Sequence, residues 1–324
     1  MKKTAVISGL ALLLLALGCR FENGNYSRAL FKHIPDDPEL LVLVKPNDVS
    51  KLAEVAMNEL DLQKIFGNTL ELDTTDWQQF QDTAVKMLEA LGIPWPQIEN
   101  VGLLLYYKKP IILATGVFNK IDVETNMQTL GFKYNDNGFF DYVYSGQKLS
   151  VPEDGVIMLA AEELLEDLQM VPEEHRLWNR ADFSEYRLTS PLDNSVFIWS
   201  HPPDHFLSDF PHREDLGDLS LAMDFKSSLN MKLTVRVKDP QKTVFLYDII
   251  FGTIGVAKGL LGSDPDYGPL FNGFQVSQDN RQVVTSVVLP YSRLEALKER
   301  FKKDFEAKDN SSFKKVRSFL DAFK

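Results

Sequence analysis

The chain has 324 residues, a formal net charge of −11 and a single cysteine. An acidic surface repels phosphate backbones, and no long basic stretch offsets it, so we expect no nucleic-acid partner. One cysteine can build neither a Cys-ligated zinc site nor an iron–sulfur cluster, but a chain of this length can bury a stable core without disulfides.

Residues 1–18 have the features of a secretory signal peptide. Two lysines precede an apolar run from Leu10 to Leu17, and the small residue Gly18 stands before Cys19. The run is too short to cross a bilayer comfortably, and polar residues follow it at once. We therefore expect cleavage after Gly18 rather than a retained transmembrane helix.

The stretch Leu15-Ala16-Leu17-Gly18-Cys19 resembles the lipobox of bacterial lipoproteins. The resemblance implies that the Cys19 thiol receives a diacylglycerol and that the new amino terminus is acylated. Several acyl chains would hold the protein on a membrane, since each buried methylene contributes about 0.8 kcal/mol. We expect a bacterial cell-envelope protein, and Arg20 after the cysteine is compatible with sorting to the outer membrane.

Residues 19–33 are predicted to be a tether, because glycine, asparagine and serine separate their scattered apolar positions. The first folded half follows over residues 34–172. It begins with an apolar strand from Leu40 to Val44, which a proline ends before a helix starts. The later predicted elements are a helical insertion over residues 73–100, an apolar hairpin over 101–118, a helix from Lys120, strands around Asn137-Gly138 and a helix over 161–170.

A connector, residues 173–190, leads to the second half, residues 191–324, where the same order recurs. Residues 35–48 align with residues 191–204 without a gap, and four positions are identical. The matched pairs are Pro35 and Pro191, Asp37 and Asp193, Pro46 and Pro202, and Asp48 and Asp204. The later predicted elements are a hairpin over residues 219–237, a helix over 243–262, strands around Asp279-Asn280 and a helix from Ser292.

This order predicts an α+β fold of two similar tandem halves, each with an antiparallel-rich sheet packed with helices. The "IPDD" opening at residues 34–37 and the strand followed by Pro-x-Asp loosely resemble families of bacterial envelope lipoproteins of unknown function. The resemblance implies the tandem α+β fold and no established reaction.

Three of the five histidines lie in the segment "HPPDHFLSDFPH", residues 201–212. His201, Asp204, His205 and His212 are therefore candidate metal ligands, with zinc as the metal, for a metal-assisted hydrolase. Pro202 and Pro203 keep the first two histidines off one regular helical turn, and the segment lacks the glutamate of an H-E-x-x-H motif. A turn between a strand and a helix is the alternative interpretation.

Two further segments suggest a binding site, one for an ion and one for an apolar group. The segment "SDPDYG", residues 263–268, has carboxylates at calcium-like spacing, but Gln275 stands where an EF-hand needs a glutamate, so a surface turn is expected. The apolar run over residues 243–262 predicts a helix buried against the sheet. Its glycines suggest a groove for an acyl chain or a partner helix.

From these observations we expect a lipid-anchored, non-catalytic binding or assembly module with no cofactor and no catalytic residue. Its expected partners are the membrane, through the lipid, and an envelope protein or hydrophobic ligand. A metal-assisted hydrolase at residues 201–212 and a carrier of lipid or another hydrophobic ligand at residues 243–262 are the two alternatives.

Overall fold

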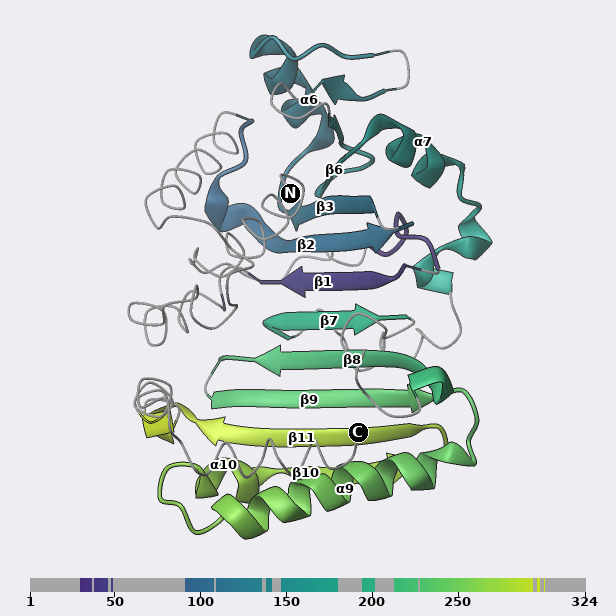
Figure 1. Cartoon of the computed structure of the whole chain (residues 1–324). Coiled ribbons are helices and arrows are strands. Elements are labelled where there is room, and N and C mark those ends of the chain that lie inside the picture. The colour runs from purple at the N-terminus through teal and green to yellow at the C-terminus, as the bar shows by residue number, and fades with distance from the viewer. Residues whose placement is uncertain are drawn as a thin grey trace, which may run out of the picture. The chain divides into compact units, whose positions relative to one another are not determined.

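The protein is described from a computed structural model with two compact units, Met1–Phe197 and Ile198–Lys324. The structure describes residues 30–36, 38–45, 48, 91–107, 109–135, 138–141, 147–179, 194–201, 213–226, 228–293, 296–297 and 300. The expected signal peptide, most of the expected tether, the helix after Pro46 and most of the insertion over residues 73–100 lie outside these residues. The mixed α+β class is confirmed, with antiparallel strands and several helices (Figure 1).

The strands of the first unit follow the spatial order β1-β2-β3-β6-β5-β4. Each neighbouring pair is antiparallel. The bounds are β1 Leu40–Val44, β2 Ile98–Tyr106, β3 Lys109–Gly116, β4 Phe140–Asp141, β5 Lys148–Ser150 and β6 Val156–Ala160. The two long strands form the predicted apolar hairpin, whose turn residue Tyr107 has a φ of 48°.

The helices of the first unit are α6, Lys120–Thr129, and α7, Glu162–Met170. Asn119 caps α6, since its side-chain oxygen accepts hydrogen bonds from the backbone N–H groups of Ile121 and Asp122. α7 turns Leu164, Leu165 and Leu168 inward. Their spacing is that of one helical face, which explains why the sequence predicts this helix well.

A β-bulge near the start of β2 holds a buried polar pair. The register shifts between Ile98 and Asn100. The Asn100 side-chain amide donates to the Thr115 hydroxyl across the hairpin, with 3.2 Å between Nδ2 and Oγ1. Both side chains are buried, so this bond satisfies groups that would otherwise lose their hydration uncompensated.

The segment from Leu30 to Asp36 packs against the first unit. Leu30 and Phe31, at the end of the expected tether, are each only 1% exposed. A residue late in the sequence of the unit holds this segment. The guanidinium of buried Arg176 donates to the His33 carbonyl at 3.1 Å and to the Val171 carbonyl at 2.7 Å. Backbone hydrogen bonds join the same stretches, from the N–H of Leu177 to the Ile34 carbonyl and from the N–H of Asp36 to the His175 carbonyl.

The strands of the second unit follow the order β7-β8-β9-β11-β10. β8 pairs antiparallel with β9, β9 with β11 and β11 with β10. The bounds are β7 Val196–Ser200, β8 Leu216–Asp224, β9 Ser228–Val237, β10 Gln275–Asp279 and β11 Gln282–Pro290. The division between the two units falls inside β7.

A second β-bulge lies near the start of β8, where the register shifts between Leu216 and Leu219. The bulge again holds a buried polar side chain. The Asp218 carboxylate lies 3.7 Å from the Arg236 guanidinium on β9, and both side chains are largely shielded from water. The paired strand therefore compensates the carboxylate that the bulge buries.

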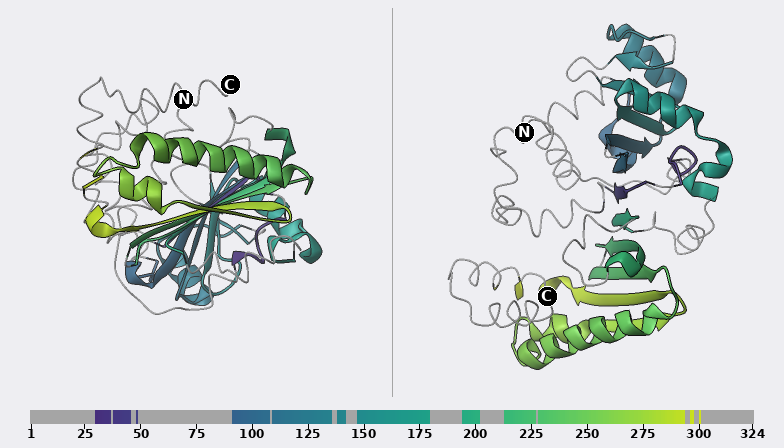
Figure 2. Two further views of the ribbon diagram at one scale, coloured as in Figure 1. Left: turned by 90° about the horizontal axis from the view of Figure 1, so that it is seen from below. Right: turned by 45° about the vertical axis from the view of Figure 1, so that its right-hand side comes forward.

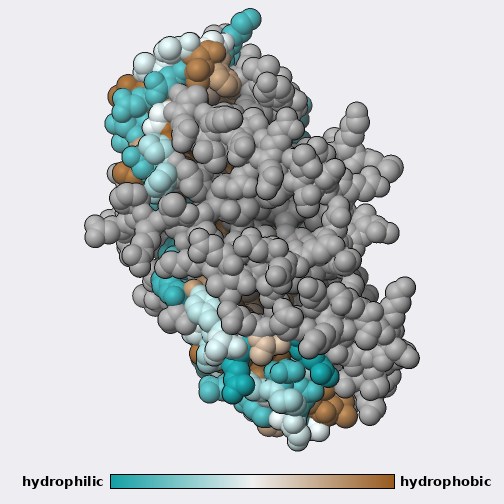
Figure 3. Space-filling model, turned by 90° about the vertical axis from the view of Figure 1, so that its left-hand side faces the viewer, coloured by the Kyte–Doolittle hydropathy of each residue, from teal (hydrophilic) through white to brown (hydrophobic). Residues whose placement is uncertain are grey.

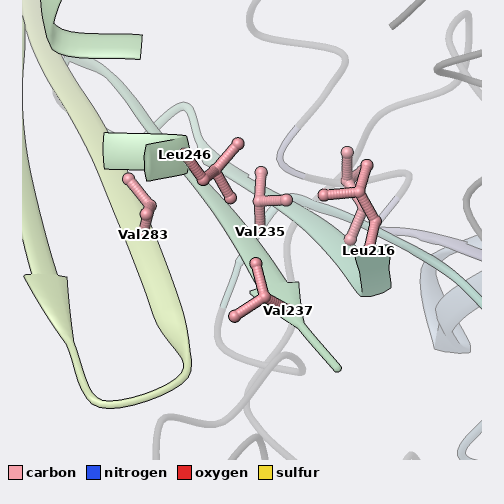
Figure 4. Packing of buried hydrophobic residues seen from close by; sticks show 6 residues of the cluster. Leu216, Val235, Val237, Leu246 and Val283 are labelled. Carbon is pink, nitrogen blue, oxygen red and sulfur yellow. The ribbon is translucent and has the colours of Figure 1, made fainter. Parts of the chain in front are cut away.

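The helix α9, Lys242–Leu261, packs one face on the sheet of the second unit, and the short helix α10, Gly268–Gly273, follows it (Figure 2). Leu246 of α9 lies among side chains from three strands (Figure 4). The buried members of this cluster are Leu216, Leu219, Val235, Val237, Leu246 and Val283. A second cluster joins the end of α9 to α10 and β11 through Leu261, Tyr267, Leu289 and Leu297.

We predict that His33 makes the stability of the first unit depend on pH. Burial lowers the pKa of His33 below its ordinary value of 6.5, and the contact with Glu153, 3.0 Å from Nε2 to Oε1, opposes the shift only in part. Since the folded state favours the neutral ring, the unfolded chain binds a proton first as the pH falls below 6.5. The free energy of unfolding should therefore fall between pH 6.5 and the lower folded-state pKa.

Urea unfolding at several pH values, from about 7.5 down to about 5, measures this effect. His33→Gln is the matched control and should lose this part of the pH dependence. Glu153→Gln removes the neighbour that favours protonation, so it should steepen the loss. A wild-type protein that gains stability over His33→Gln as the pH falls would show that the ion pair outweighs burial.

Candidate functional site

The outer face of α9 carries several exposed apolar side chains. The sequence predicts this helix as buried, but that is wrong for one side, because only 17% of its most apolar stretch is buried. Val244 is 55% exposed, Phe251 is 56% exposed and Leu260 is 47% exposed. By length and composition alone α9 could also cross a membrane. In the space-filling view a small apolar patch lies among hydrophilic residues near the height of α9 and α10 (Figure 3).

The side chains on this outer face differ between the two halves of the helix. The N-terminal half presents bulky residues, Val244, Phe245, Asp248 and Phe251, and the C-terminal half presents Gly252, Gly255 and Gly259. A period of 3.6 residues places all seven on one side of the helix. The face thus has a bulky half and a flat half, and Asp248 is its one acidic residue.

The three glycines of the flat half are not required by the described fold. A Cβ added at Gly252, Gly255 or Gly259 meets no atom within 4 Å. Each glycine inside a helix costs roughly 0.5–1 kcal/mol relative to alanine. By contrast, a Cβ at Gly268 would come within 2.5 Å of the Gly262 carbonyl oxygen, so packing explains that glycine.

The flat half opens outward and not toward the sheet. Gly252, Gly255 and Gly259 are all exposed, and the side of α9 that carries Leu246 and Ala257 fills the space next to the strands. The glycines therefore make no internal groove for an acyl chain between α9 and the sheet. They form a surface on which another surface can approach the helix backbone closely.

Of the candidate metal ligands, the structure describes only His201. Its ring stacks on Trp199 of β7, with 5.9 Å between ring centroids and an interplanar angle of 12°. Trp199 is 1% exposed, so this stacking attaches the histidine to the core of its unit. Asp204, His205 and His212 lie outside the described residues, and the convergence of the cluster stays a prediction. Among the residues that the structure describes, no group of three or more histidine, cysteine or acidic side chains could hold a metal ion.

The segment over residues 263–268 forms a turn held by Asp264. Its Oδ1 accepts hydrogen bonds from the backbone N–H groups of Asp266 and Tyr267, at 2.9 and 3.0 Å. Those bonds, first of all the one from Tyr267, lower the pKa of Asp264 below its ordinary value. Arg300 lies 3.8 Å from the carboxylate and stands over the Tyr267 ring. The carboxylate therefore stabilises the turn that leads into α10.

The sequence signals part of this site. The apolar run predicts α9 and its glycines raise the possibility of a partner helix, but the division into a bulky half and a flat half becomes visible only when the exposed side is known. No sequence signal points to Arg176 as the residue that holds the segment after the tether.

Comparison with known proteins gives little further information. No family model matches the chain, and no curated protein matches it. Crystal forms IV and III of TP0453 are similar in structure, with TM-scores of 0.41 and 0.39 and sequence identities of 12% and 11%. These matches cover 82% of this chain and 95% and 96% of the TP0453 chains. Similarity at this level supports no statement about function.

We predict that Asp264→Ala destabilises the second unit by about 1–2 kcal/mol, because two backbone N–H groups lose their acceptor. Asp266→Ala is the matched control, since the described turn uses the backbone of Asp266, and it should change stability by less than about 0.5 kcal/mol. Chemical unfolding followed by circular dichroism measures both. A calcium-dependent stabilisation that Asp264→Ala abolishes would instead support an ion site.

Proposed function

We propose that this chain is a lipid-anchored bacterial cell-envelope protein that acts as a non-catalytic binding or assembly module. The observation that carries the binding role is the outer face of α9, which is apolar, exposed and shaped by glycines that the fold does not need. A soluble helix of ordinary composition places charged and polar residues there. Contact with another molecule removes such apolar surface from water.

The anchor part of the proposal depends on the amino-terminal sequence. Leu15 to Cys19 supply the lipobox-like stretch, and ten residues, 20–29, separate the modified cysteine from Leu30, the first described residue. Ten extended residues span at most about 35 Å. The anchor would therefore keep the first unit close to a membrane, and we propose the outer membrane as its location.

We also propose that the two units are copies of one ancestral unit. The strand orders β1-β2-β3-β6-β5 and β7-β8-β9-β11-β10 have the same connectivity, which supports the proposal. The two bulges support it too. Ile98 and Leu216 mark them at a separation of 216 − 98 = 118 residues, and the same separation relates the buried polar residues Asn100 and Asp218.

A surface contact is better supported than the carrier or the hydrolase. An internal carrier site would need a cavity, but the glycines of α9 face outward. The hydrolase requires His201 to meet three residues that lie outside the described chain. The binding module requires only the exposed face itself.

We expect Cys19→Ser to release the protein from membranes, because serine cannot receive the thioether-linked diacylglycerol. Fractionation of cells that express the wild type or the variant measures the release. Mass spectrometry of the amino-terminal peptide of the wild type should show an acylated Cys19. A variant that stays in the membrane fraction after a high-salt wash would contradict the anchor and leave the role of α9 open.

We expect α9 to contact another macromolecule in the intact envelope. A photoreactive phenylalanine analogue at Phe251 should form specific adducts that mass spectrometry can identify. The matched control is the same analogue at Ile121, which is 70% exposed on α6 of the first unit. Equal adducts from both positions, or none from Phe251, would contradict the binding role.

A further inference from the structure

We propose that the partner of the outer face of α9 is the α9 of a second copy of this chain, packed antiparallel. This inference deepens the proposed binding role of the face and does not depend on the lipid anchor. The shape of the face, the charges of the helix and the freedom to substitute its glycines support it together.

The shape of the face is self-complementary when one helix is reversed. Around a twofold axis between Phe251 and Gly252, residue i faces residue 503 − i of the second copy, since 251 + 252 = 503. Three of the four positions of the bulky half then lie level with a glycine of the other copy. These pairs are Val244 with Gly259, Asp248 with Gly255 and Phe251 with Gly252.

The charges of α9 also favour the antiparallel arrangement. The helix carries three charged residues, Lys242, Asp248 and Lys258. A parallel pair would place the two Asp248 side chains together. The antiparallel pair separates them and places each Asp248 level with Gly255 of the other copy. Lys242 and Lys258 are engaged within their own unit, 3.4 Å from the Asp215 carboxylate and 3.1 Å from the Phe274 carbonyl oxygen.

The shape of the face also disfavours a parallel pair. It would place Val244 and Phe245 against their own copies and leave the glycine halves facing each other across a gap. Reversing one helix allows the backbones to approach as closely as the glycines permit, with the bulky side chains filling the space.

The contact is expected to be weak in dilute solution. A helix of 20 residues is about 30 Å long and about 10 Å wide, so its footprint of roughly 300 Å² is below the roughly 800 Å² per partner of a standard stable interface. Anchoring two copies in one membrane would raise their effective concentration. The test therefore needs to trap weak contacts and to report their geometry.

Disulfide trapping meets both needs because Cys19 is the only cysteine of the chain. In the full-length Cys19→Ser chain, one new cysteine is introduced at a time, and linked dimers are measured after mild oxidation. Gly252→Cys lies beside the proposed axis and should give at least about five-fold more linked dimer than Met170→Cys. Met170 is the control because it is 82% exposed, on α7 of the first unit.

The orientation is tested by a second pair of variants. Gly259→Cys alone should give no more linked dimer than Met170→Cys, because the two copies of residue 259 lie far from the axis on opposite sides. Mixed with Val244→Cys, it should form a linked heterodimer. A strong homodimer from Gly259→Cys would indicate a parallel pair and overturn the proposal.

Gly255→Leu separates loss of contact from loss of folding. Its Cβ enters open space and leucine favours helix, so the variant should raise the unfolding midpoint of the chain. Combined with Gly252→Cys it should abolish the extra linked dimer, since leucine blocks close approach. Persistence of the dimer in this variant would also overturn the proposal.

The remaining outcomes distinguish this inference from the proposed function. If Gly252→Cys links no better than Met170→Cys while the chain floats with phosphatidylcholine and phosphatidylglycerol vesicles, a lipid surface is the partner and the self-contact is overturned. Photo-adducts from Phe251 to a different protein, without linked dimers, would overturn the self-contact and support the binding role. Absence of adducts, linked dimers and vesicle binding would overturn both.

Discussion

The apolar face of the sheet in the second unit has to be covered, and α9 covers it with one side of a largely apolar helix. Leu246, Ala257 and Leu261 lie on the buried side. Burying a leucine is worth roughly 1.5–3 kcal/mol, so this contact holds the helix in place. The same composition continues around the helix, and the fold does not need it there. The exposed apolar face therefore calls for an explanation outside the packing of this unit.

The glycines separate what the fold requires from what it does not. At Gly262 and Gly268 an added Cβ would collide with backbone oxygens at 2.4 and 2.5 Å, so the turn after α9 depends on them. At Gly252, Gly255 and Gly259 the fold would accept a larger residue. These three glycines lower the stability of the helix and are not needed for packing within the unit. Such residues are expected where a surface is shaped for contact with another molecule.

The sequence predicts the strands, the hairpins and the helices α6, α7 and α9 because their apolar periods and turn residues are local signals. It does not predict which side of α9 is exposed, because the three charged residues of this helix lie on different sides and form no polar stripe to indicate the solvent face. The packed state of Leu30 and Phe31 also escapes prediction. Arg176 holds the segment that contains them through the His33 carbonyl, 143 residues earlier in the chain, and no local pattern indicates such a partner.

The proposed duplication makes α6 the counterpart of α9, so the two helices can be compared. In each unit a helix follows the long hairpin, α6 in the first and α9 in the second. α6 has 10 residues, an asparagine cap and many polar side chains, as a helix at a water-exposed surface needs. α9 has 20 residues, and Lys242, Asp248 and Lys258 are its charged ones. The two units share a strand order and a bulge beside a buried polar residue, and among their described helices they differ most in α9. If the duplication holds, a new binding role is expected at this helix, because function is added to a scaffold where its copies diverge.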